Sequence, residues 1–426
     1  MIKTLTNRWF IAIMGTLLQL VLGTVYAWSY FQKPIIIAYG WSNVQTMWIF
    51  SLSILFLGLS AALGGIILPK YGPKKLASIG ALLYGLGYLL SAYAMQINSL
   101  ALFYIGFGGI GGMGLGLGYV TPVATVSKWF PDKKGFVTGM VVMGFGLGAL
   151  FMSKLIAPTL IRLTEGNMIH VFFYIALVVL AIGVPAGLCM QNPPNNFSPE
   201  GFVVADLNID QKDEKAQFTL YKSLISIKFL GMWFMFFLNI SAGIIFIGLQ
   251  SPMIQDLFKS HDKSMSTEAL AMAGGSLIAI SALFNGVGRF FWGGLSDKIG
   301  QIEVFRWILG SQIVAFLFLI NTTNPWIFGS LVCYVLLCYG GGFGAMPSYI
   351  LEVFKARHMP IIYGVILTAW SFGGIVGPQM AAFIRDFYAT SPEMIGPRTY
   401  MAGIVLLSFG FLISLRLSNA PITPKS

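Results

Sequence analysis

Twelve long apolar segments constrain the fold of this chain more than any other feature of its sequence. A helix needs about 20 predominantly apolar residues to cross a bilayer, whereas the strands of a membrane barrel are about half that length. We therefore expect an all-α membrane protein with twelve transmembrane helices. The segments lie near 9–31, 44–69, 76–97, 100–127, 136–160, 168–190, 229–254, 268–295, 303–321, 325–351, 360–385 and 398–417.

The distribution of charge predicts the orientation in the membrane. Only 10% of the residues are charged, against roughly 25% in soluble domains. The net charge is +11, and most of the 26 Lys and Arg residues fall in the loops and ends that share a side with the amino terminus. The positive-inside rule then puts both termini in the cytoplasm. The positive charge indicates topology in a lipid bilayer, which we expect to be a bacterial inner membrane, and not a nucleic-acid partner.

A polar stretch at 191–228 divides the chain into two parts. We expect an amino-terminal six-helix bundle at 1–190, a cytoplasmic linker at 191–228 and a carboxy-terminal six-helix bundle at 229–426. The loops after the second and eighth segments share residues at one constant offset, which indicates an internal repeat of the parallel kind found in one class of transporters. The matching residues are Gly65, Lys70 and Gly72 in the first loop and Gly293, Lys298 and Gly300 in the second, where Asp297 also stands.

Arg289 is the only charged residue between Ala269 and Ser296. A charge inside an apolar helix is costly and marks a candidate functional site. No Asp or Glu lies in the middle of an apolar segment, so we expect the counter-ion to be a substrate anion, which a guanidinium binds through two parallel hydrogen bonds. Asn285 and Ser281 lie one and two turns earlier on the same helix face. The alternative, in which Arg289 snorkels to the cytoplasmic surface, is disfavoured because Asp297 at that surface is about 12 Å away.

Two stretches resemble a known family. The stretch 114–150, with KWFPDKKG as its most specific part, and NGVGRFFWGGLSDKIG at 285–300 resemble the oxalate/formate antiporter family of the major facilitator superfamily, which is related to bacterial monocarboxylate (lactate/pyruvate) transporters. The resemblance implies two pseudo-symmetric six-helix bundles, a conformational motif in the two matching loops, and a carboxylate-binding Arg at position 289. The first loop departs from the motif, because Pro69 stands where the family has Asp.

The eleventh segment departs from the family in a way that bears on the substrate. Oxalate transporters of this family are understood to use a Lys there, and the stretch 361–383 contains none. One buried positive charge suits one negative charge, so we expect a small monocarboxylate anion such as lactate, pyruvate or formate. Oxalate:formate exchange is the alternative, and a non-transporting carboxylate sensor is a remote one. Lys154 is either a second cation of the site or a residue that snorkels to the outer surface, and we favour the latter.

The resemblance also implies aromatic walls around the site, for which Tyr119, Tyr26, Trp370 and Phe343 are the candidates. His358 is the candidate coupling residue, and the choice between coupled protons and a counter-transported anion stays open. No catalytic pair, metal cluster or cofactor motif is recognisable, and the cysteines fit no metal or redox spacing. We therefore expect a monomeric transporter without enzymatic activity, cofactor or metal.

Overall fold

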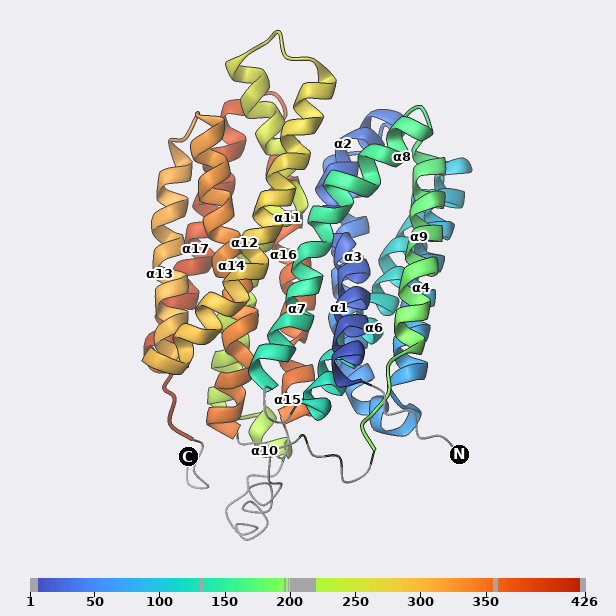
Figure 1. Cartoon of the computed structure of the whole chain (residues 1–426). Helices are drawn as coiled ribbons and strands as arrows, with labels where there is room; N and C mark the ends of the chain where they lie inside the picture. The colour runs from blue at the N-terminus through green and yellow to red at the C-terminus, as the bar shows by residue number, and fades with distance from the viewer. Residues whose placement is uncertain are drawn as a thin grey trace.

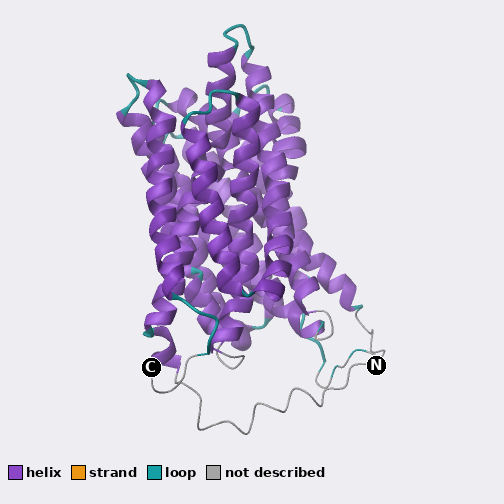
Figure 2. Cartoon of the chain, turned by 90° about the vertical axis from the view of Figure 1, so that its left-hand side faces the viewer, coloured by secondary structure: helices purple, strands orange, loops and turns teal. Residues whose placement is uncertain are grey.

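The computed structural model describes residues 7–130, 134–194, 197, 199, 220–354 and 359–421. Over these residues the chain forms helices joined by loops, with no strand (Figure 2). Twelve of the helical segments are long and apolar enough to cross a membrane, as the sequence predicted. Because the number of crossings is even, the start of the first span and the end of the last lie on one side of the membrane.

Several of the first six spans are built from more than one helical piece. In chain order they are α1 (Arg8–Leu22), η1 (Gly23–Ala27) and α2 (Trp28–Tyr39); α3 (Asn43–Tyr71); α4 (Pro73–Gln96); α5 (Leu100–Phe103), η2 (Tyr104–Gly111) and α6 (Gly112–Trp129); α7 (Lys134–Phe151), η3 (Met152–Ile156) and α8 (Ala157–Leu163); and α9 (Met168–Leu188).

The second six spans follow the short helix α10 (Leu220–Leu224). They are α11 (Ile227–His261); α12 (Thr267–Ile299); α13 (Gln301–Ile320); α14 (Pro325–Phe354); α15 (Met359–Ile366) with α16 (Thr368–Phe387); and α17 (Ile395–Arg416), which follows the single turn η5 (Pro392–Met394).

Two spans run further than the sequence predicted. The first was expected to end near residue 31, yet it continues through Pro34 to Tyr39 and ends at Gly40, whose φ of +69° favours glycine. The seventh was expected to end near 254, and α11 continues through Asp256 to His261. Each extension carries one partner of an ion pair, Lys33 in α2 and Asp256 in α11.

The helices of the first half lie beside one another, and so do those of the second half. Figure 1 shows the blue-to-green helices on the right and the yellow-to-red helices on the left. Within the halves α4 packs on α9 and α12 on α14, while α3 packs on α16 and α7 on α12 across the divide. Much of 191–228 lies outside the described residues, so the exact division at this linker remains a prediction.

The two matching loops have the same local geometry. Gly72 ends α3 with a φ of +78°, and Gly300 ends α12 with a φ of +94°. Each donates its N–H to the carbonyl four residues earlier, to Leu68 and Ser296 respectively. A positive φ is strained for residues other than glycine, so the repeated glycines have a shared backbone reason.

The charged part of the motif is solvated at this end of the molecule. Asp297 and Lys298 are exposed, and neither forms an ion pair with a residue of the described ranges. Gly65 and Lys70 stand at the corresponding end of α3, where Lys70 lies over the ring of Tyr71. The conformational role of the two loops therefore stays a prediction.

Candidate anion-binding site

Arg289 is buried between the two halves of the molecule, with only 4% of its surface exposed. Its Nη1 lies 3.5 Å from the hydroxyl of Tyr119, at the outer limit of a hydrogen bond. Its Nε and Nη2 have no hydrogen-bond partner in the part of the chain that the structure describes. No carboxylate pairs with it there either. The guanidinium therefore has unused donors in a place where water cannot freely replace a partner.

Aromatic side chains surround the guanidinium. Its carbon lies 5.1 Å from the ring centroid of Phe343, which is a cation–π distance. Trp370 joins the cage, because its ring centroid lies 4.8 Å from that of Phe343, 5.3 Å from that of Tyr119 and 6.3 Å from that of Tyr26. All four rings are buried. The structure thus brings together the four aromatic residues that the sequence singled out, from η1, α6, α14 and α16.

Three aromatic residues of this cage were missed in the sequence. The hydroxyl of Tyr339 lies 2.9 Å from that of Tyr26. The ring of Phe145 contacts both Tyr26 and Tyr119, with 5.1 Å between centroids in each pair. Tyr363 lies beside Tyr119 and within the field of Arg289. Helical spacing offered a signal for two of them, since Tyr339 precedes Phe343 by one turn and Tyr363 precedes Trp370 by two.

Glycines allow the helices that carry the site to approach closely. A Cβ atom at Gly344 of α14 would clash with the carbonyl oxygen of Arg289, and one at Gly340 would clash with that of Asn285. On α12, a Cβ atom at Gly288 would meet the carbonyl of Leu337 in the same way. The backbones of α12 and α14 are therefore in direct contact, which places the ring of Phe343 against Arg289.

The first span is locally tightened where it enters the site. Residues Gly23–Ala27 form a short 3₁₀ segment, and a Cβ atom at Gly23 would clash with the backbone of Phe145 on α7. Such a tightened turn changes the direction in which side chains leave the helix. Tyr26 lies within this segment, which accounts for its inward position beside Phe145.

The polar residues that precede Arg289 on α12 are buried with it. Ser281 donates a hydrogen bond to the Oε1 atom of Gln250 on α11, at 2.7 Å. Asn285 is 1% exposed, and its Oδ1 atom has no partner among the described residues. Both side chains line a cavity of about 10 Å³, together with Gln250 and the ring of Tyr26. The predicted polar stripe of α12 therefore borders a small internal space.

Of the two candidate secondary charges, only Lys154 lies within the described residues. Lys154 is exposed in η3, and its Nζ donates a hydrogen bond to the hydroxyl of Ser276 at 2.6 Å. No contact of Lys154 with the aromatic cage occurs within the described residues, and its position at the outer surface stays a prediction. His358 lies outside the described residues. Among those residues, no group of His, Cys, Asp and Glu is arranged to hold a metal ion.

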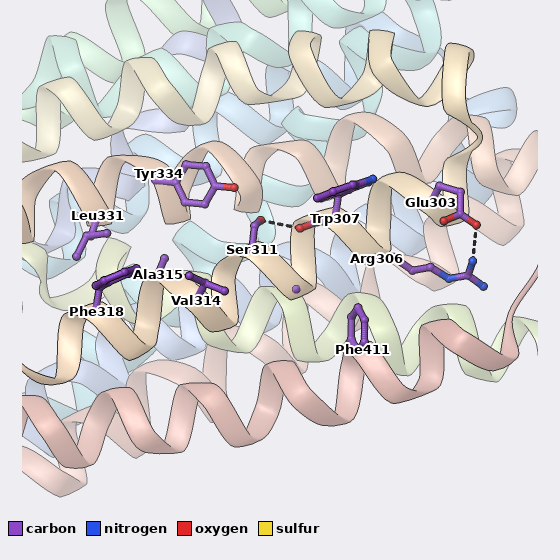
Figure 3. A pocket seen from close by; sticks show the side chains of 11 residues that line it. Glu303, Arg306, Trp307, Ser311, Val314, Ala315, Phe318, Leu331, Tyr334 and Phe411 are labelled. Carbon is purple, nitrogen blue, oxygen red and sulfur yellow. Dashed lines mark hydrogen bonds and ion pairs between the residues drawn. The ribbon is translucent and has the colours of Figure 1, made fainter.

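A larger cavity, of about 710 Å³, lies away from Arg289 (Figure 3). It is a groove on the outside of the second half, between α13, α14 and α17, with the ion pair of Arg306 and Glu303 at one end. Trp307 and Phe318 in its wall are strongly exposed. Exposed apolar side chains on membrane-spanning helices face lipid, so the groove borders the acyl chains and is not a continuation of the buried site.

Comparisons with known proteins agree with this architecture. A sequence profile of the Major Facilitator Superfamily matches residues 8–378. The chain is 27% identical to the "Oxalate:formate antiporter" of Oxalobacter formigenes over 95% of its own length and 92% of the relative's. It is 28% identical to "Apicoplast pyruvate carrier 1" of Toxoplasma gondii, with 81% of this chain and 69% of the relative covered.

Solved structures share the fold at lower sequence similarity. The chain matches a bacterial homolog of the human lysosomal transporter Spinster, solved in an inward-facing and unoccupied conformation, with a TM-score of 0.68 and 14% identity. The match covers 99% of this chain and all of that protein. At this identity the likeness concerns the arrangement of helices alone.

Proposed function

Because this chain belongs to the Major Facilitator Superfamily and is a transporter rather than an enzyme, we propose that it carries small monocarboxylate anions by alternating access around Arg289. In this scheme the two halves rock about a central site and expose it to each side of the membrane in turn. Lactate, pyruvate and formate are the candidate substrates. Their single carboxylate matches the one cation, Arg289, that contacts the cage among the described residues.

One observation carries the proposal, namely that Arg289 is buried without a counter-ion among the residues that the structure describes. Its Nε and Nη2 are unpartnered in the described part of the chain. An unpaired charge at this depth is costly, whereas a bidentate carboxylate satisfies two donors and neutralises the charge at once. The hydroxyl of Tyr119 adds a donor at the same place. Trp370 and Phe343 would supply aromatic walls for a small, nearly planar anion.

Uptake into proteoliposomes tests this assignment. Purified protein reconstituted with unlabelled substrate inside is expected to accumulate labelled lactate, pyruvate or formate, whereas Arg289→Gln abolishes the uptake. Arg289→Lys is expected to be severely impaired, because an ammonium cannot reproduce the planar two-donor fork. Full uptake by Arg289→Gln contradicts the proposal.

Folding of these variants needs an independent measurement. Ligands that bind the folded state raise the apparent melting temperature, so the substrate should shift it for the wild type and fail to shift it for Arg289→Gln. The control is Arg398→Gln, since Arg398 is exposed at the start of α17. This variant should retain both the uptake and the shift.

Oxalate:formate exchange is the second candidate, and the similarity to an antiporter of that name favours it. Oxalate carries two negative charges. Within the described residues, Arg289 is the only Lys or Arg that contacts the rings of the cage. Saturable transport of oxalate that lactate inhibits competitively would establish this alternative. Binding of a carboxylate without any counterflow would instead indicate a sensor.

We extend the proposal to the setting of the carrier. The excess of Lys and Arg on the side of the termini supports a cytoplasmic position for both ends. The location that we propose is a bacterial inner membrane. Residues 1–190 and 229–426 act as the two moving bundles, linked by 191–228, and the carrier works as a monomer. Movement of the anion is balanced either by a proton, for which His358 is the candidate relay, or by a counter-transported anion.

A further inference from the structure

We propose that Gln250, Ser281 and Asn285 form a hydroxyl-binding notch beside Arg289, which selects short 2-hydroxy monocarboxylates over acids that lack the hydroxyl. The inference rests on the proposed function, because it assumes that the substrate carboxylate is bound by Arg289. It adds the residues that recognise the hydroxyl group on the second carbon of the substrate.

The notch is the small cavity on the side of Arg289 nearer the start of α12. Its volume of about 10 Å³ is close to the least that holds one water-sized group. Such a group needs polar partners, and apolar cavities of this kind stay empty. The polar partners here come from two helices, Gln250 from α11 and Ser281 and Asn285 from α12.

The polar atoms of the notch have unused hydrogen-bonding capacity. Ser281 donates to Gln250 Oε1 at 2.7 Å, which fixes the orientation of the Gln250 side chain. No hydrogen bond of Gln250 Nε2 occurs among the described residues, although the side chain is only 2% exposed. Asn285 Oδ1 is fully buried and has no partner among the described residues. Buried polar groups in native proteins are almost always satisfied, so these point to a ligand group or a water.

The notch and the guanidinium are adjacent along the helix. Asn285 precedes Arg289 by four residues, and long helical side chains lean toward the amino-terminal end of their helix, so the guanidinium lies over the turn of Asn285. Tyr26 connects the two places, because its ring lines the notch and its hydroxyl bonds to Tyr339 of the cage. In the proposed arrangement, a carboxylate on Arg289 would have its second carbon on the side of the notch.

The chemistry of the notch matches a hydroxyl group. An amide pair offers both a donor and an acceptor, and a hydroxyl uses both. A keto oxygen only accepts, formate has no group to place there, and a methylene leaves the amides unpaired. The second carboxylate of oxalate would enter an uncharged space, where an unpaired ion is costly. Short 2-hydroxy acids of the lactate and glycolate type fit best.

A competition experiment separates this inference from the proposed function. Counterflow of labelled L-lactate into proteoliposomes is inhibited in turn by unlabelled L-lactate and by propionate, which has the same carbon skeleton without the hydroxyl. For the wild type we expect the inhibition constant of propionate to exceed that of lactate about tenfold, which corresponds to one net hydrogen bond of ordinary strength. Glycolate against acetate should give the same ordering.

Variants assign the preference to the notch. Gln250→Met keeps the length of the side chain and removes its amide, so the ratio of the two inhibition constants should fall to about twofold or less. Ser281→Ala should lower the ratio as well, because the Gln250 side chain loses its fixed orientation. Ser276→Ala is the matched control, since Ser276 lies on the same helix and bonds to Lys154. It should keep the wild-type ratio.

The outcomes are distinct. Equal inhibition by propionate and lactate in the wild type, or an unchanged ratio in Gln250→Met and Ser281→Ala, overturns the notch and leaves the transport of monocarboxylates intact. The wild-type ratio decides even where a variant fails to fold. Loss of competition by both acids, or full transport by Arg289→Gln, overturns the proposed function itself.

Discussion

The carboxylate of Asp386 accepts hydrogen bonds from both the backbone N–H and the side-chain amide of Asn43, at 3.2 and 2.9 Å. It also accepts the backbone N–H of Val44 at 2.9 Å. Asp386 lies near the end of α16 and Asn43 begins α3, so this contact joins the two halves at the end of the molecule away from the loops of Gly72 and Gly300. A carboxylate is favourable at a helix start, where N–H groups lack partners within the helix.

We predict that Asp386→Ala favours opening of the site on this side. Loss of hydrogen bonds to a charged acceptor should weaken the closed arrangement by about 1–3 kcal/mol. The reporter is Ser153→Cys in a background without Cys189, Cys333 and Cys338, because Ser153 is buried where η3 meets α12. Its rate of maleimide labelling should rise about tenfold or more when Asp386 is replaced.

A matched control isolates the contact between the halves. Asp262 is an exposed aspartate in the turn between α11 and α12, and among the described residues its carboxylate bonds only to Ser264 of that turn. Asp262→Ala should leave the labelling rate of the reporter unchanged. Equal labelling in the Asp386 and Asp262 variants would show that the Asp386 contact does not hold the site closed.

A second contact on the same side predicts an order of effects. Asp256 of α11 pairs with Lys33 of α2 at 3.1 Å and also with Arg385 of α16. The side chain of Lys33 is 34% exposed and that of Arg385 is 17% exposed. Exposed ion pairs contribute about 0–1 kcal/mol, and less screened ones contribute more. Only the Lys33 pair joins the two halves, because α11 and α16 both belong to the second half. Lys33→Gln should therefore increase labelling of the Ser153→Cys reporter more than Arg385→Gln does, although Arg385 is less exposed, and the reverse order would contradict this account.

The sequence predicted the number of transmembrane spans more accurately than the positions at which the spans end. The number of spans follows from apolar segment length, and Gly72 and Gly300 could be matched because a positive φ calls for glycine. The ends of the first and seventh spans were predicted too early, and the ion pair of Lys33 with Asp256 lies in the helical parts beyond those predicted ends. Contacts between side chains on distant segments leave no periodic pattern in the sequence of either segment. The sequence of a single segment therefore does not reveal them.

The site could be predicted from the sequence where a charged residue stands in an otherwise apolar segment. Arg289 stands out in an apolar segment, and the resemblance of its neighbourhood to a known family placed aromatic residues near it. Phe145 was missed because a Phe in a glycine-rich apolar helix looks like any packing residue. Tyr26 faces inward through the tightened turn of η1, and helical spacing alone does not predict such a turn.

The contact of α12 with α14 leads to a prediction at Gly344. A methyl group there would clash with the carbonyl oxygen of Arg289, so α14 would have to move away and carry the ring of Phe343 with it. Overpacking of this kind costs about 1–3 kcal/mol. Gly344→Ala should lower both the melting temperature and the affinity for the substrate. Gly294→Ala is the control on α12, since a Cβ atom there meets nothing within 4 Å, and a loss of affinity in this control would refute the steric explanation.

Lys154 offers a test of the charge argument for a singly charged substrate. Its Nζ is exposed and bonds to Ser276, away from the aromatic cage. Interactions of exposed charges contribute about 1 kcal/mol or less, so Lys154→Gln should keep monocarboxylate uptake within a few-fold of the wild type. The measurement is the inhibition constant of lactate and of oxalate in the same counterflow assay. If Lys154→Gln instead removes oxalate transport that the wild type performs, Lys154 is a second cation of the site, and the carrier binds a dicarboxylate between Arg289 and Lys154.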